Sequence, residues 1–239
     1  MRRAISLLLL LVAAAASAAG CSGADAQQAQ ALLAQSDAAW ADVTSATFSM
    51  RLWTSGAPQD FSLIMSGGGY AKGKHEGDFY VLATADNVGF GDFTLVNRKG
   101  RLSMSVDGQR FTTVATPTSQ SNPIQVFDFS KYVKDVRVEH GKELDGQAMT
   151  KLSGLIDTGG VVDETLSSLG EVSQLGGGGV DLSKVLGDTH VVLYISDATH
   201  LPMRGLIDLP VTMAGTKVTL HMDFAYTSVN EPVAFPGLT

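Results

Sequence analysis

The sequence contains very little cysteine, little proline and little charge. Cys21 is the only cysteine among 239 residues, which excludes an internal disulfide framework and any multi-cysteine metal site. Only 17% of the residues are charged while 44% are hydrophobic, so the composition is not that of a disordered chain. The mean hydropathy of +0.13 favours either a large solid core or an apolar-lined interior.

Motifs for catalysis and metal binding are also missing. The chain has no His-Glu-x-x-His motif and no Gly-x-Ser-x-Gly motif. The glycine runs at 67–69 and 176–179 lack the context of a phosphate-binding loop. Asp163 and Glu164 lie at an expected helix start, where the helix dipole explains them. The scattered histidines are His75, His140, His190, His200 and His221. We therefore expect no enzyme activity, no metal and no cofactor.

Positive charge is scarce as well. The chain has 17 basic and 24 acidic residues, and the basic count includes Arg2 and Arg3 in a segment that we expect to be removed. The remaining 15 basic residues give a net charge of −9. Such a chain repels phosphate backbones, which argues against nucleic acid as a partner.

The first twenty residues have the layout of an export signal. Arg2 and Arg3 precede an apolar run over 5–16, which is too short to span a bilayer comfortably. Small residues follow at 17–20, and the chain's only cysteine comes next. The sequence around Cys21 matches the end of a lipobox, so we expect a signal peptide over 1–20 and a diacylglycerol on Cys21. Residues 21–30 are small and polar and are expected to form a lipidated tether.

After the tether, the spacing of apolar residues is first that of a helix and then that of β-strands. Residues 28–43 are predicted to form a helix. Strands with alternating apolar residues are predicted over 48–53, 61–66, 79–83, 93–95, 102–107, 136–140, 148–155, 191–195, 203–209 and 218–226. Gly67–Gly69 is expected to break this pattern, and Asp107-Gly108 and Asp145-Gly146 are expected to form hairpin turns.

Between the strand runs lie three further predicted helical segments, at 124–136, 161–172 and 182–186. Residues 176–179 are expected to form a hinge, and 160–187 an element that opens a cavity. The fold class is therefore α+β. It consists of a single large curved antiparallel sheet of about ten or eleven strands with helices packed against it.

The apolar residues of the strands are the candidate binding site. They would fall on shared sheet faces and line an apolar cavity if the interior is hollow. Periodicity alone cannot distinguish a lined cavity from a solid core, so both readings stay open. The candidate cavity residues are Phe48, Met50, Leu52, Phe61, Leu63, Met65, Val191, Leu193, Val218, Leu220, Met222 and Phe224.

Short motifs in a fixed order resemble the LppX/LprG-type mycobacterial lipoproteins. The segment 193–204 carries a strand, an Asp, Leu-Pro and an Arg, and the ending from Asp223-Phe224 to Pro236 is similar. Lys151-Leu152-Ser153-Gly154 and the stretch from Leu32 to Phe48 also match. The resemblance covers roughly residues 30–239.

The resemblance implies a half-barrel sheet with helices on its concave side around an apolar cavity. Residues 31–239 would form one lipid-binding domain that carries acylated lipids or glycolipids across the cell envelope. The chain would be anchored on the extracytoplasmic side of the cell membrane, with a membrane transporter as a candidate partner. Arg204 is expected to pair with Asp197. The alternative is a non-enzymatic envelope interaction or sensor module that binds a protein partner.

Overall fold

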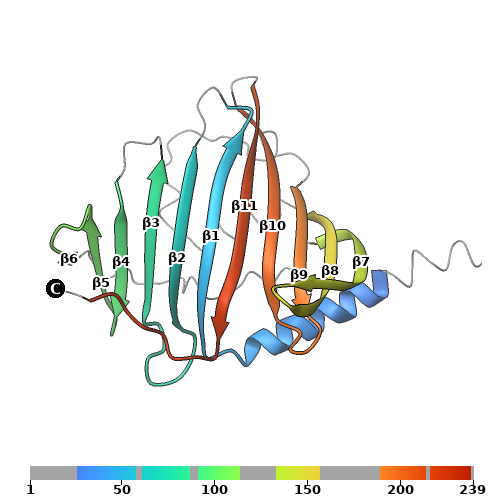
Figure 1. Ribbon diagram of the computed structural model, residues 1–239, viewed down its shortest axis with the longest axis horizontal. Helices are drawn as coiled ribbons and strands as arrows, with labels where there is room; N and C mark the ends of the chain where they lie inside the picture. The colour runs from blue at the N-terminus through green and yellow to red at the C-terminus, as the bar shows by residue number, and fades with distance from the viewer. Residues whose placement is uncertain are drawn as a thin grey trace, which may run out of the picture.

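A computed structural model describes residues 26–57, 61–86, 91–113, 133–156, 189–213 and 216–237. Most of them form one antiparallel sheet, and a helix at residues 26–41 lies against it (Figure 1). The strands are β1 (Ser45–Ser55), β2 (Ser62–Tyr70), β3 (Phe79–Asp86), β4 (Phe93–Arg98), β5 (Arg101–Val106), β6 (Thr112–Thr113), β7 (Val133–Leu144), β8 (Gln147–Ile156), β9 (Thr189–Ser196), β10 (Pro202–Met213) and β11 (Thr216–Val229).

The strand order is β6-β5-β4-β3-β2-β1-β11-β10-β9-β8-β7. Two meanders, β1 to β6 and β7 to β11, are therefore joined where the first strand pairs with the last. Met50 of β1 lies opposite Phe224 of β11 on one side and Met65 of β2 on the other. In the described part of the chain the sheet stays open, with β6 and β7 at its edges. This confirms the single large antiparallel sheet and is consistent with a half-barrel.

The helix packs on the sheet through small and aliphatic side chains. Ala29 and Leu33 are buried in a cluster with residues of β8, β9 and β11. The helix ends at 41, earlier than the predicted 43, because two backbone bonds of the tighter i to i−3 type close its last turn, at Asp42 and Val43. Val43 is then buried in a second cluster with Ala46 and Leu201. The helix begins at 26, two residues before the predicted start at 28, and so includes residues 26–30 of the expected tether.

The glycine run at 67–69 is not a break, contrary to the sequence-based prediction. All three glycines are buried inside β2. A Cβ on Gly67 would lie 2.7 Å from the Phe48 ring, and one on Gly68 would lie 2.8 Å from the Thr47 side chain. Larger neighbours on β1 therefore cover the positions where β2 has no side chains, which is why glycine continues the strand here.

The helix predicted over 124–136 is wrong in its last residues. Residues 133–136 belong to β7, where Val133 pairs with Ile156 of β8. The rest of that helix and the predicted helices at 161–172 and 182–186 lie outside the described residues. So do the expected hinge at 176–179 and most of the expected opening element. Within the described part, the helical cover of the sheet is the helix at 26–41.

The C-terminal segment crosses the sheet on the face opposite the helix (Figure 1). Val233 is buried there, and its backbone N–H donates to the Tyr70 hydroxyl at 3.0 Å. The Phe235 ring stacks on Tyr70 and lies 5.2 Å from the Arg98 guanidinium. This segment covers the β2–β4 part of that face.

Candidate functional site

The strand register gathers the apolar side chains on one face of the sheet, which we call the apolar face. One row of cross-strand neighbours runs across nine strands without a polar side chain. It comprises Leu152, Leu193, Gly205, Phe224, Met50, Met65, Ala83, Phe93 and Val106. The next row continues it with Val191, Ile207, Met222, Leu52, Leu63 and Ala85. The helix at 26–41 packs on this same face, because its cluster includes Leu193 and Phe224.

The candidate cavity residues all belong to this side of the sheet. Eleven of them lie on strands at apolar-face positions, and Phe61 directly precedes β2 with the same alternation as Leu63. Phe48, Val191, Leu193 and Phe224 are buried. The other eight are only half-buried: Met50, Leu52, Phe61, Leu63, Met65, Val218, Leu220 and Met222.

The apolar face extends further than the candidates named from the sequence. β3, β4 and β5 add Val81, Leu95 and Met104, which lie in register with Phe48 across Gly67. The alternation in these short strands was visible in the sequence. The register alone shows that they continue the same face.

No charged side chain lies on the apolar face in the described residues of β1–β5 and β8–β11. Arg51, Lys151, Arg204, Asp208 and Asp223 all occupy positions of opposite alternation and so lie on the other side, which we call the polar face. Burying an unpaired charge is costly, so this segregation suits a face that is shielded from water.

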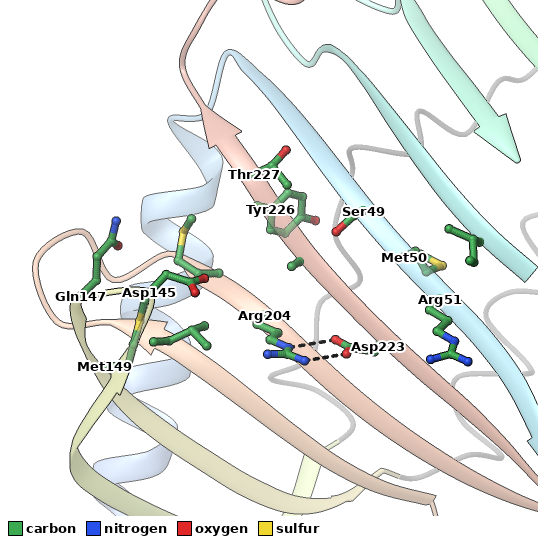
Figure 2. Close-up of a pocket in the computed structure, with 14 residues that line it drawn as sticks. Ser49, Met50, Arg51, Asp145, Gln147, Met149, Arg204, Asp223, Tyr226 and Thr227 are labelled. Carbon is green, nitrogen blue, oxygen red and sulfur yellow. Dashed lines mark hydrogen bonds and ion pairs between the residues drawn. The ribbon is translucent and has the colours of Figure 1, made fainter.

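The polar face carries an open groove of about 630 Å³ (Figure 2). The Arg204 guanidinium and the Asp223 carboxylate form a bidentate pair in it, with N–O distances of 2.9 and 2.6 Å. This pairing with Asp223 raises the pKa of Arg204. Asp145 of the β7–β8 turn and Gln147 at the start of β8 line one side of the groove.

The predicted pairing of Arg204 with Asp197 is wrong. Arg204 lies on the polar face, where Asp223 is on the neighbouring strand. Asp197 lies in the turn after β9 and accepts a hydrogen bond from the Thr150 hydroxyl at 2.7 Å. Thr150 is on the apolar side of β8. Strand alternation therefore places Arg204 and the Thr150–Asp197 pair on opposite faces of the sheet.

Metal ligands do not converge in the described part of the chain, where no group of three or more His, Cys, Asp or Glu side chains could hold an ion. Across the same residues, no helix has the length and apolar content needed to cross a membrane. Cys21, Asp163 and Glu164 lie outside the described residues.

Comparison with known proteins gives a structural match without a sequence match. No family model matches the chain, and no curated protein matches it. The structure is similar to that of LprF from Mycobacterium bovis, with a TM-score of 0.57 and 17% identity over 89% of this chain and 97% of LprF. The lipoprotein LppX from Mycobacterium tuberculosis has a TM-score of 0.47 and 16% identity, over 87% of this chain and 98% of LppX. The likeness to LprF confirms an LppX/LprG-type fold. At this identity it shows the fold alone.

Proposed function

We propose that this protein is a membrane-anchored lipoprotein that binds the acyl chains of a lipid or glycolipid on its apolar face and carries them across the cell envelope. The observation that carries the proposal is the row of uncharged residues that crosses nine strands. Eight candidate residues in this row or on the same face are only half-buried. A polar or charged ligand would find no partner on such a surface.

The physical driving force is removal of apolar surface from water. Burial contributes about 25 cal/mol per Å², or about 0.8 kcal/mol for each CH₂ group. Met50, Met65, Met104 and Met222 all lie on the apolar face and are half-buried. Methionine is flexible and polarisable, so this face can adapt to acyl chains of different shape.

The anchor would come from Cys21, after removal of residues 1–20. The helix begins at residue 26. Five residues can span at most about 18 Å, so lipid on Cys21 would hold the helix start close to the outer side of the cell membrane. A membrane transporter is the further partner that we propose. The protein's role is that of a carrier without enzymatic turnover of the lipid.

A second candidate function is an envelope module that binds a protein partner. The groove on the polar face favours it, because Ile64 lines that groove with 53% of its surface exposed. Exposed apolar residues beside paired charges are typical of protein interaction surfaces.

Native mass spectrometry separates the two functions. The soluble form starting at Ser22 is purified from a bacterial host with a comparable envelope, measured intact and then extracted with solvent. We expect a stoichiometric adduct that extracts as a multi-acylated lipid. A bare mass that persists when envelope lipids are offered contradicts the carrier function and leaves the protein-binding module.

A further inference from the structure

Three polar side chains on neighbouring strands of the polar face form a hydrogen-bonded chain. Ser55 is on β1, His221 on β11 and Asp208 on β10. The Ser55 hydroxyl oxygen lies 2.8 Å from His221 Nε2, and His221 Nδ1 lies 2.6 Å from an Asp208 carboxylate oxygen. Asp208 pairs with His221 in register, and His221 pairs with Trp53, two residues before Ser55.

The hydrogen bond to Asp208 fixes the tautomer of the neutral His221 ring. A carboxylate can only accept, so His221 donates its Nδ1 proton to Asp208. In the neutral form of the imidazole the lone pair is then on Nε2, in position to accept the proton of the Ser55 hydroxyl. A serine is activated as a nucleophile when its hydroxyl is hydrogen-bonded to the basic nitrogen of an imidazole that is held in a fixed orientation.

The imidazole is also held in place by a ring contact. Trp53 stacks on His221 with ring centroids 5.0 Å apart and an angle of 17° between the planes. The Arg51 guanidinium lies 5.1 Å from the Trp53 ring centre. The His221 ring is therefore positioned by both a hydrogen bond and a stack, as an efficient general base requires.

We propose that Ser55 is an activated nucleophile that cleaves small esters from solution. Ser55 is exposed, and 57% of the Asp208 side chain is exposed, so a solvent-borne ester can reach the site. The site is on the polar face and is independent of the proposed acyl-chain surface.

The reaction balances without any other reactant than water. The Ser55 oxygen attacks the ester carbonyl carbon while His221 Nε2 takes the hydroxyl proton. The alkoxide leaves with that proton as an alcohol, and an acyl group remains on Ser55. Water then attacks the acyl group, His221 again accepts and returns a proton, and the acid is released with Ser55 restored.

A lysine is on the same face of β11 as His221. Thr219 is the register partner of Ser55, and Lys217 follows on the same face of β11. The exposure of Asp208 weakens its electrostatic effect on the imidazole. We therefore expect an acceleration at the lower end of general-base catalysis, about 10²-fold over the uncatalysed reaction.

The test uses a fluorophosphonate probe and p-nitrophenyl acetate on the soluble protein. We expect labelling that maps to Ser55, and ester hydrolysis that is lost in Ser55→Ala and in His221→Ala. Asp208→Asn should lower the rate about tenfold or more, because it removes the acceptor that fixes the imidazole tautomer. Ser66→Ala is the matched control, since Ser66 is also exposed on the polar face.

Absence of labelling would overturn the proposal. So would labelling that survives Ser55→Ala, or a wild-type rate in His221→Ala, since either result reduces the three residues to a surface hydrogen-bond network. Circular dichroism of each variant establishes that it is folded. The lipid adduct is measured on the same samples, and its presence or absence does not bear on Ser55.

Discussion

At the scale of single residues, close packing between β1 and β2 depends on the absence of a side chain at Gly67 of β2. A Cβ on Gly67 would meet the Tyr80 carbonyl oxygen at 2.5 Å as well as the Phe48 ring at 2.7 Å. The carbonyl is backbone and cannot move aside by a rotamer change. Gly67 is therefore needed for space, in addition to any effect on backbone conformation.

Gly67→Ala should destabilise the protein by about 1–3 kcal/mol, because the added methyl group overpacks the β1–β3 contact. Urea denaturation followed by circular dichroism measures the change. Ser66→Ala, at the exposed neighbouring position, should stay within about 0.5 kcal/mol of the parent. Equal stability of Gly67→Ala and the parent would show that the two strands separate easily at this point.

Glu139 illustrates how charge pairing acts on a single carboxylate. Its oxygens lie 2.7 Å from the Lys151 ammonium and 2.9 Å from the Lys142 ammonium. The hydrogen bond from Lys151, followed by that from Lys142, lowers the pKa of Glu139 from 4.5 to about 2. The ionised form is therefore favoured more in the folded state than in the unfolded one.

This lowered pKa predicts an acid-dependent loss of stability. A carboxylate with a depressed folded pKa stabilises fully above its unfolded value, and the contribution falls as the pH drops from about 4.5 towards about 2. The free energy of unfolding of Glu139→Gln should therefore be lower than that of the parent near pH 6 and converge with it near pH 2. Glu143→Gln, on the same strand, is the control. A difference that is unchanged near pH 2 would contradict the charge-pairing explanation.

At the scale of elements, the helix at 26–41 is held by a narrow stripe of small and aliphatic side chains. Ala29 and Leu33 are buried against β8, β9 and β11. At the other end of the helix, Trp40 contacts Tyr226 with ring centroids 4.5 Å apart. Burial of the Tyr226 phenol raises its pKa well above the usual value, so the hydroxyl stays neutral in this contact.

Leu33→Ala should cost about 2–5 kcal/mol, since it opens a cavity between the helix and the sheet. Chemical denaturation of the soluble form gives the change. Gln35→Ala, on the exposed side of the same helix, should have an effect within about 0.5 kcal/mol. If Leu33→Ala matched Gln35→Ala, the helix would not be docked on the sheet in solution.

At the scale of the whole molecule, the sheet separates two surfaces. The apolar face is proposed for acyl chains, while the polar face holds the groove, the Arg204–Asp223 pair and the Ser55–His221–Asp208 chain. Because successive strand residues point to opposite faces, one substitution can change one surface and leave the other intact.

Met65→Glu should abolish the lipid adduct, because a carboxylate in the middle of the apolar row would have to be buried beside acyl chains. Ser66→Glu places the same charge one residue later on the polar face and should retain the adduct. Native mass spectrometry of both variants, with circular dichroism as a folding control, measures the result. Retention of the adduct by Met65→Glu would place the ligand elsewhere.

Local sequence pattern was sufficient for much of the fold. The period-two alternation predicted strands at ten places where strands occur, and Asp107-Gly108 and Asp145-Gly146 do lie in the turns between strands. Both aspartates have positive φ, the conformation that such turns require. The alternation also grouped the apolar candidates correctly, because side-chain direction within a strand is fixed by the backbone.

Local alternation was therefore enough to locate most of the strands and to show that their apolar side chains share a direction. It could not show which strands are neighbours, because strand pairing joins segments that are far apart in the sequence and no local pattern encodes it. The pairing of β1 with β11 placed Met50 beside Phe224 and Ser55 beside His221. The pairing of β10 with β11 placed Arg204 beside Asp223 instead of Asp197. The place of Gly67 and Gly68 inside a strand also depends on tertiary contacts, because side chains of β1 occupy the space beside these two glycines.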